Sequence, residues 1–183
     1  HEVGHYLVTR YSKNIRSYKN AFVSILPFED ALGLTASYED VGKQLTFDKE
    51  YFIDEIASLL GGRVGEEMYT NKYSSGAVSD LDMASTMAEQ VIMSYGLSDR
   101  KNEKNKSYTI AETYVKDFLL TDEIKKEIND EITELIKKGY DRATKIIHNH
   151  KELHEKIVSK LLEEGILIGT ELDLSLIHIS EPT

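Results

Sequence analysis

Residues 1–5 read His-Glu-Val-Gly-His, which is an H-E-x-x-H pattern. Two histidines spaced in this way lie on one face of a helix, about 40° apart, because an α-helix has about 3.6 residues per turn. Both imidazoles can then reach one zinc ion, and Glu2 can stand beside a water bound there. The pattern therefore predicts His1 and His5 as metal ligands and Glu2 as a catalytic general base.

The chemistry that such a site supports is hydrolysis. Zinc lowers the pKa of bound water toward about 7, so a carboxylate can complete its deprotonation at neutral pH, and the hydroxide can attack a peptide carbonyl. The same spacing also arises on an ordinary amphipathic helix whose histidines are only packed or solvated. Gly4 suggests close approach of another segment, because glycine inside a helix costs about 1 kcal/mol relative to alanine.

Composition limits the class of protein. The 183 residues suffice for one domain with a buried core. The net charge of −10 argues against nucleic acid as a partner, since phosphate binding needs a basic surface. Cysteine is absent, which excludes disulfides and cysteine-ligated zinc. No run of about 18 apolar residues occurs, so we expect a soluble piece without direct membrane contact.

Hydrophobic periodicity predicts a mainly α fold of the α+β class, with a small β-hairpin or sheet. Helices are expected over residues 1–12, 48–70, 77–95, 122–149 and 151–164, and strands over 21–27 and 31–37. Asp48 is expected to cap the second helix, and Gly96 to follow the end of the third. His148, His150 and His154 are predicted to be surface or capping residues rather than a second metal site.

A catalytic zinc usually takes three protein ligands and leaves one position for water. A metzincin would continue as H-E-x-x-H-x-x-G-x-x-H, but those later positions are Val8 and Tyr11. A thermolysin-like enzyme would use a glutamate some two dozen residues on, a spacing that Glu29 has. Glu29 lies between two predicted strands, whereas a ligand is best held on a rigid element.

Three further blocks follow the zinc pattern in order. They are Leu-Leu-Gly-Gly-Arg-Val-Gly-Glu-Glu at 59–67, Ser-Ser-Gly-Ala-Val-Ser-Asp-Leu-Asp-Met-Ala at 74–84, and Tyr-Gly-Leu-Ser-Asp at 95–99. Together these blocks resemble the peptidase domain of FtsH-type, membrane-anchored AAA+ zinc peptidases, and they are far more specific than the zinc pattern alone. The resemblance covers residues 1–173 and implies a helical zincin-type peptidase domain.

The resemblance also implies further site residues. The family's third ligand corresponds to Asp80, although Asp80 or Asp82 could instead interact with a helix dipole. These two carboxylates would point about 200° apart on a helix, so only one can face the metal. Glu66 matches a family glutamate that could hold the outer nitrogen of a ligand histidine. Its alternative role is an exposed helix carboxylate.

Five consecutive residues, Ala31, Leu32, Gly33, Leu34 and Thr35, resemble the family's active-site edge strand. A substrate peptide could add to such a strand through main-chain hydrogen bonds, which tolerate many side chains. Gly33 would permit close approach of another backbone. The alternative is an ordinary hairpin strand.

The function implied by the resemblance is that of a zinc metalloendopeptidase with one catalytic Zn²⁺. It would act on unfolded or membrane proteins as a homo-hexamer at the cytoplasmic face of a membrane. ATP and Mg²⁺ would bind only an upstream AAA+ module, since this piece lacks a G-x-x-x-x-G-K-[ST] loop. The alternatives are a catalytically inactive zinc-binding or oligomerisation domain of the same ancestry, and a helical interaction module with an accidental motif.

The chain departs from the family pattern at Val3, at residues 28–30 and at Ser79, where Ala, Arg-Gly and Asn are usual. These changes remove neither a ligand nor the base, so they bear on substrate preference. The chain begins inside the metal motif without an initiator methionine, so we expect a fragment. Residues 174–183 (LSLIHISEPT) resemble a translated sequencing adapter, and we expect that tail to be non-native.

Overall fold

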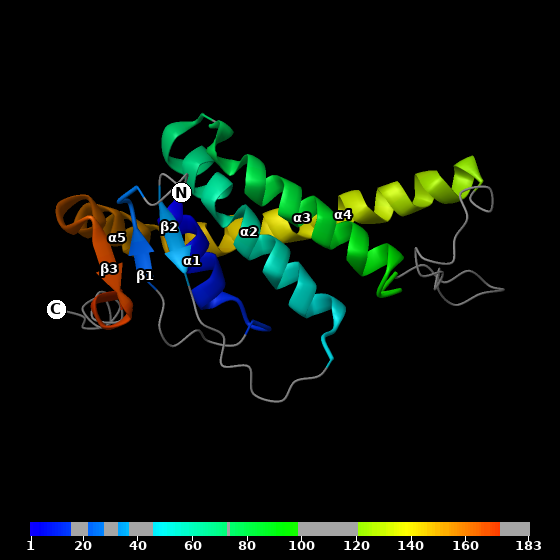
Figure 1. Ribbon diagram of the computed structural model, residues 1–183, viewed down its shortest axis with the longest axis horizontal. Coiled ribbons are helices and arrows are strands. Elements are labelled where there is room, and N and C mark those ends of the chain that lie inside the picture. The colour runs from blue at the N-terminus through cyan, green and yellow to red at the C-terminus, as the bar shows by residue number, and fades with distance from the viewer. Residues whose placement is uncertain (16–21, 28–32, 37–45, 73, 99–120, 173–183) are drawn as a thin grey trace.

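The computed structural model describes residues 1–15, 22–27, 33–36, 46–72, 74–98 and 121–172 (Figure 1). The helices are α1 (Glu2–Tyr11), α2 (Lys49–Thr70), α3 (Val78–Met93), α4 (Asp122–Asn149) and α5 (Lys151–Glu164), with a 3-10 turn η1 (Ser75–Ala77). The strands are β1 (Phe22–Ser24), β2 (Leu34–Ala36) and β3 (Ile166–Ile168). The predicted mainly α, α+β class is confirmed.

Helices α2, α3 and α4 lie alongside one another and form the long body of the molecule (Figure 1). Their apolar stripes meet in one cluster because buried residues recur every three or four positions on each helix. The fully or nearly buried members are Ile53, Ile56 and Leu60 of α2, Ala84, Ala88, Val91 and Ile92 of α3, and Ile128 and Leu135 of α4. This packing gives α2 and α3 fixed relative positions.

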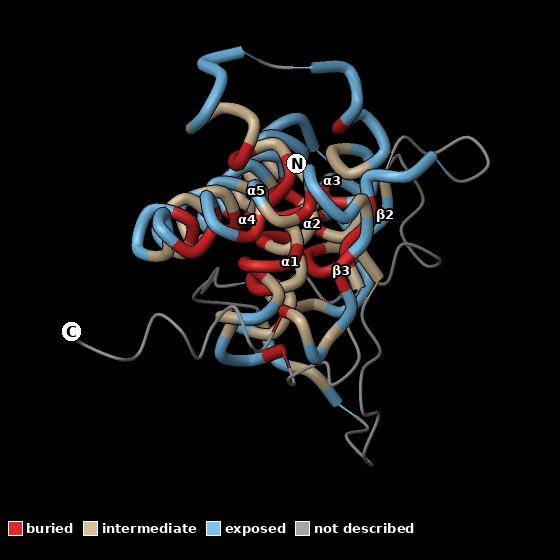
Figure 2. Tube along the Cα trace, turned by 90° about the vertical axis from the view of Figure 1, so that its left-hand side faces the viewer, coloured by how far each residue is buried: buried red, intermediate tan, exposed pale blue. Residues whose placement is uncertain are grey.

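Helix α1 contacts both the long helices and the small sheet. Val3, Tyr6 and Leu7 belong to a buried cluster with α5 and the sheet. On the other side, Val8 packs with residues of α2 and α4. Buried residues are concentrated along α1 and its neighbours in the view of Figure 2. The H-E-x-x-H helix is therefore a central and rigid element.

The sheet has the order β2-β1-β3 with antiparallel pairing throughout. Val23 of β1 lies opposite Thr35 of β2 and Leu167 of β3, and both Val23 and Leu167 are fully buried. The predicted strand pair is thus present, although residues 25–27 and 33, which were predicted as strand, lie outside β1 and β2. The sequence reasoning missed β3. Gly165, with φ of 78°, ends α5 and turns the chain into this third strand.

The helix boundaries follow the expected signals, with small differences at α3 and at α1, which spans residues 2–11 rather than the predicted 1–12. The Asp48 carboxylate accepts a hydrogen bond from the Tyr51 backbone N–H at 2.9 Å, so the predicted N-cap of α2 is confirmed. Helix α3 begins one residue later and ends two residues earlier than predicted. Gly96 does take a positive φ of 64° just beyond it.

A buried carboxylate ties the end of α1 to α2 and α4. Asp54 of α2 is 1% exposed and accepts hydrogen bonds from the Asn14 backbone N–H at 2.8 Å and from Arg142 at 2.6 Å. The same arginine pairs with Glu50 at 2.7 Å. Because the buried Asp54 carboxylate is hydrogen-bonded to Asn14 and to the half-buried Arg142, it links the three helices at this end of the molecule.

His154 is a correction to the expected surface histidines. Its ring is 4% exposed and stacks on Tyr69 with centroids 4.4 Å apart. Both ring nitrogens are buried without a hydrogen-bond partner in the described structure. Burial lowers the pKa of His154 to about 4, because the charged ring would lose its hydration. By contrast, His148 is exposed, and His150 Nδ1 donates to the Ile146 carbonyl as a capping residue does.

Burial of His154 is expected to make folding acid-sensitive. The folded-state pKa lies below the unfolded value of 6.5, so the unfolded state binds more protons as the pH falls from 6.5 toward 4. The free energy of unfolding should therefore fall by about 2 kcal/mol when the pH is lowered from 7.5 to 5. Urea unfolding at the two pH values checks it. The difference in unfolding free energy between the two pH values should shrink in His154→Phe and persist in the matched control His148→Phe. An equal difference in both variants would contradict the prediction.

Candidate metal centre

His1 and His5 stand one helical turn apart at the start of α1. The His5 backbone N–H donates to the His1 carbonyl at 3.2 Å, so the first turn is closed across exactly the spacing of the motif. The two imidazoles meet edge to face, with centroids 4.7 Å apart. Their Nε2 atoms are 3.2 Å apart, so both rings present a nitrogen to one point.

Asp80 brings a third donor to that point from the first turn of α3. Its Oδ2 lies 3.4 Å from His1 Nε2 and 3.4 Å from His5 Nε2. Within the part of the chain that the structure describes, these side chains form a group able to hold one metal ion. Asp82 is exposed and does not belong to the group. Glu29 lies outside the described residues.

The donor triangle fits zinc. Its sides are 3.2, 3.4 and 3.4 Å. Ligand atoms about 2.0–2.2 Å from a tetrahedral ion lie about 3.3–3.6 Å from one another. Two imidazoles and one carboxylate, arranged with these separations, leave a fourth position for water or substrate. The residues present are therefore suited to a catalytic rather than a closed structural site.

The outer nitrogen of each imidazole has its own partner. His1 Nδ1 is 2.8 Å from Glu66 Oε1, and His5 Nδ1 is 2.8 Å from the Ser58 carbonyl oxygen. Both partners are acceptors, so each neutral ring carries its hydrogen on Nδ1 and leaves the Nε2 lone pair free for a metal. The contact expected for Glu66 is present; the role of the Ser58 carbonyl had no signal in the sequence.

Glu66 also connects the two halves of the site. Its carboxylate accepts hydrogen bonds from the Ser74 backbone N–H at 3.1 Å and from the Ser74 hydroxyl at 3.0 Å. Ser74 in turn caps the short turn η1 that leads into α3 and Asp80. One carboxylate therefore aligns His1 on α1 with the segment that delivers the third donor.

The pKa shifts reflect this convergence. A hydrogen bond to Asp80 raises the pKa of His1 against the opposing effect of burial. Burial disfavours the charged form of Asp80, but hydrogen bonds from the two imidazoles hold its pKa well below the usual range. The pKa of Glu66 is likewise lowered, because contacts with Ser74 and His1 outweigh its burial. The site therefore stabilises positive charge, as a cation site must.

Glycines allow α1 and α2 to touch through their backbones. A Cβ on Gly4 would collide with the Gly61 carbonyl, and a Cβ on Gly61 would lie 2.7 Å from the Gly4 carbonyl oxygen. The expectation that something approaches Gly4 closely is confirmed. A Cβ on Gly62 would collide with His5 Nε2 and lie 2.6 Å from His1 Cε1. Gly62 thus forms the floor under both imidazoles.

Glu2 is held against β2. Its carboxylate Oε2 accepts a hydrogen bond from Thr35 Oγ1 at 2.7 Å, and Gly33 lies beside the other oxygen. The structure therefore brings the predicted base next to two of the five predicted substrate-strand residues. Leu34 of the same strand is exposed, while Ala31 and Leu32 lie outside the described residues.

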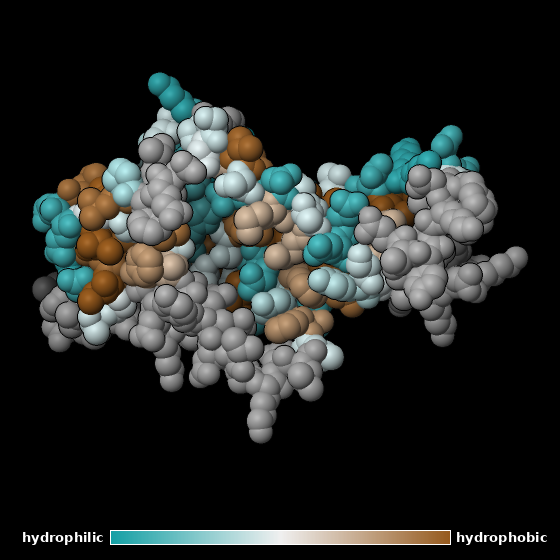
Figure 3. Space-filling model, viewed as in Figure 1, coloured by the Kyte–Doolittle hydropathy of each residue, from teal (hydrophilic) through white to brown (hydrophobic). Residues whose placement is uncertain are grey.

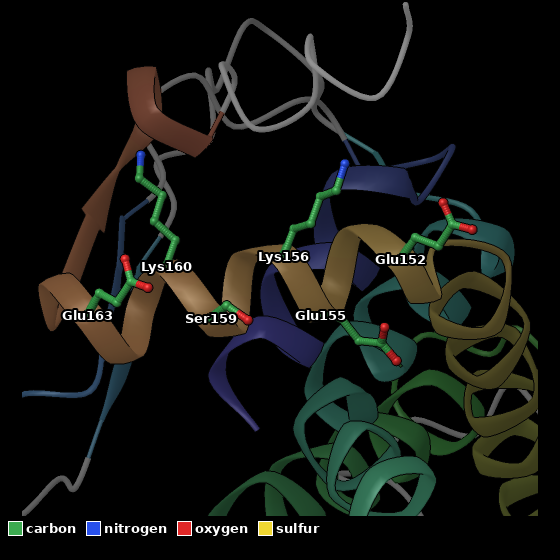
Figure 4. Close-up of a pocket in the computed structure, with 6 residues that line it drawn as sticks. All are labelled: Glu152, Glu155, Lys156, Ser159, Lys160 and Glu163. Atoms are coloured by element: carbon green, nitrogen blue, oxygen red, sulfur yellow. The ribbon is translucent and has the colours of Figure 1, made fainter. Parts of the chain in front are cut away.

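Two surface features lie on α5 and β3 rather than at the donor triangle. One is a shallow hollow along a single face of α5, shown in Figure 4 and lined by Glu152, Glu155, Lys156, Ser159, Lys160 and Glu163. Alternating charges of this kind are typical of a solvated helix face. The other is an apolar surface at the end of the molecule where α5 and β3 lie (Figure 3), with Leu162, Ile166 and Ile168 exposed.

The described helices were also considered as membrane spans. None of them combines the length and apolarity that crossing a bilayer requires.

Comparison with known proteins gives a family match over almost the whole chain. The model for Peptidase family M41 matches residues 1–174. The chain is 32% identical over 178 residues to an ATP-dependent zinc metalloprotease FtsH of Syntrophotalea carbinolica, and 30% identical to one of Pseudothermotoga lettingae, covering 94% of this chain in each case.

A third relative, ATP-dependent zinc metalloprotease FtsH 4 of Synechocystis, is 32% identical over 190 residues and covers 100% of this chain. The chain spans less than a third of the length of each relative: 27% for Syntrophotalea, 28% for Pseudothermotoga and 30% for Synechocystis. The chain belongs to Peptidase family M41, the FtsH-type zinc metallopeptidases.

Proposed function

We propose that this chain is the catalytic domain of a zinc-dependent metalloendopeptidase that hydrolyses peptide bonds in unfolded proteins. One observation carries the proposal: three donor atoms of His1, His5 and Asp80 form a triangle of zinc dimensions. Glu66 and the Ser58 carbonyl orient the two imidazoles toward its centre. The names of the relatives, which are zinc metalloproteases, support the same chemistry.

In this proposal the three donors hold one Zn²⁺, which supplies Lewis-acid activation of water and of the substrate carbonyl. Glu2 accepts a proton from the attacking water and later delivers it to the leaving amine. The water oxygen joins the carbonyl carbon, the C–N bond breaks, and the proton ends on nitrogen. Glu2 thus acts first as a base and then as an acid.

Substrate is proposed to bind along β2. This strand is terminal in the order β2-β1-β3, and Glu2 is bordered by its residue Thr35 and by Gly33, which directly precedes it. A peptide in extended conformation could add to β2 by main-chain hydrogen bonds and would then lie beside the base. Leu34 would contribute its main chain, while Ala31 and Leu32, the other residues expected for this role, lie outside the described residues. Backbone recognition suits an enzyme that accepts many unfolded sequences.

For the whole protein we propose ATP-dependent proteolysis. The relatives are named ATP-dependent and are more than three times as long as the matched chain. An upstream AAA+ module that binds ATP and Mg²⁺ would unfold soluble or membrane proteins and feed them to this domain. Assembly as a homo-hexamer at the cytoplasmic face of a membrane rests on the family resemblance.

The test of the metal site is zinc content in the full-length protein. About one zinc per chain is expected, with a large loss in Asp80→Ala, because a carboxylate ligand is removed. The matched control Asp82→Ala should keep its zinc, since that side chain is exposed. Elemental analysis after dialysis gives the stoichiometry.

Other outcomes would redirect the proposal. Full zinc in Asp80→Ala would move the third ligand elsewhere, with Glu29, Glu66 and Asp82 next to be tested. Stoichiometric zinc without cleavage of an unfolded protein would favour a catalytically inactive zinc-binding or oligomerisation domain. Absence of zinc would leave a helical interaction module.

A further inference from the structure

Strand β2 makes a specific contact with the proposed base. Thr35 Oγ1 lies 2.7 Å from Glu2 Oε2 and 2.9 Å from the Glu2 backbone carbonyl oxygen. The hydroxyl carries one hydrogen, which these two acceptors share. It therefore ties the carboxylate of Glu2 to the backbone of the same residue.

Gly33, the residue directly before β2, borders the other half of the Glu2 side chain. A Cβ at this position would lie 2.7 Å from Glu2 Oε1 and 2.9 Å from Glu2 Cγ. Gly33 and Thr35, two residues apart in the chain, thus both lie against the Glu2 side chain. The carboxylate occupies space that any larger residue at position 33 would take.

We propose that Thr35 and Gly33 are positioning residues that set the orientation of the Glu2 carboxylate. Thr35 does this with its hydroxyl, and Gly33 does it by leaving room. The inference deepens the proposed function and rests on it, because Glu2 acts as a general base only if the site hydrolyses peptides. It adds a role for side-chain positions on a strand otherwise expected to act through its main chain.

The energetic reason is the freedom of glutamate. Its three side-chain torsions would spread an untethered carboxylate over several rotamers. A catalytic group displaced by about 1 Å can cost on the order of 100-fold in rate. The position of Thr35 is itself fixed, since it pairs with the fully buried Val23 of β1. A slip of β2 by one residue would turn the hydroxyl away from Glu2.

The experiment compares Thr35→Val, Thr35→Ser and Gly33→Ala in the full-length protein, with cleavage of an unfolded protein as the assay. Valine keeps the shape and the strand preference but lacks the hydroxyl, so kcat should fall about 10- to 100-fold while KM stays within about two-fold. Serine should restore most of kcat. Gly33→Ala should lower kcat similarly, because the new methyl group would push the Glu2 side chain, and with it the carboxylate, out of position.

Zinc content and melting temperature should not change in these variants. The matched control is Thr144→Val, which removes a hydroxyl that donates to the Tyr140 carbonyl within α4 and should leave kcat unchanged. Undiminished kcat in Thr35→Val, equal losses in the valine and serine variants, or loss of zinc along with kcat would each overturn the proposal.

A second readout separates this inference from the proposed function. Crystal structures of the variants should show the Glu2 carboxylate displaced in Thr35→Val and Gly33→Ala and in place in Thr35→Ser. An undisplaced carboxylate would overturn the positioning role even if the enzyme is active. Failure of the wild-type protein to cleave, or full activity of Glu2→Gln, would instead defeat the proposed function.

Discussion

Replacing Glu2 by glutamine is expected to lower kcat by about 10²- to 10⁴-fold, the range that a positioned general base contributes. Glutamine keeps the length of the side chain and can accept a hydrogen bond from Thr35, but it cannot take a proton from water. Zinc content should stay at the wild-type level, because Glu2 is not one of the three converging donors. Steady-state cleavage and zinc content are measured on the same preparation.

The matched control for Glu2→Gln is Glu89→Gln, a neutralisation at an exposed position of α3. It makes the same change in net charge and should leave kcat unaltered. Turnover retained in Glu2→Gln would exclude Glu2 as the base, and lost zinc would assign it to the metal site instead.

Alanine at position 62 is expected to reduce zinc affinity by 100-fold or more, at or beyond the upper end of the roughly 10- to 100-fold effects of residues that orient metal ligands. The new methyl group would collide with His5 Nε2 and lie 2.7 Å from His1 Nδ1. Both contacts are ring atoms at the ends of side chains, so the metal-free protein can accommodate the methyl by turning the imidazoles. With zinc bound the rings cannot turn, so the collision would destabilise the zinc-bound form of the protein relative to the metal-free form. Competition with a chromogenic chelator measures the affinity.

Gly65→Ala is the control for Gly62→Ala, because it lies on the same helix and near the same crossing. Its Cβ would meet Gly4 Cα and His154 Nε2 at an ordinary 3.5 Å. Zinc affinity should be unchanged in Gly65→Ala, and its metal-free melting temperature should rise slightly, since alanine favours a helix by up to about 1 kcal/mol over glycine. Equal zinc affinity in the two variants would show that Gly62 is not the floor of the site.

What the sequence predicted well is local. The spacing of His1 and His5 fixes their shared helix face, and Asp48 caps α2 by a contact between near neighbours in sequence. Long periodic helices such as α4 were found at their observed bounds, because one period repeated over many residues leaves little doubt about the element. Asp80 came from a resemblance rather than from the pattern, since no spacing rule joins α1 to α3.

What the sequence could not predict depends on contacts between distant segments. Strand β3 spans only three residues, Ile166–Ile168, and is a strand because β1 lies beside it. His154 is polar by residue type, and its burial follows from the packing of α5 on the ring of Tyr69. The contact between Thr35 and Glu2 joins residues 33 positions apart through the sheet, so neither residue type nor periodicity could indicate it.

Mutation can disturb the orientation of the two proposed histidine ligands to different degrees. His1 takes its orientation from Glu66, a side chain that a single codon change can remove. His5 takes its orientation from the main-chain carbonyl of Ser58, which every amino acid at that position would still supply. Genetic drift can therefore loosen one ligand directly and the other only by distorting a helix. We expect loss-of-function alleles acting on ligand orientation to accumulate at position 66 and to be sparse at position 58.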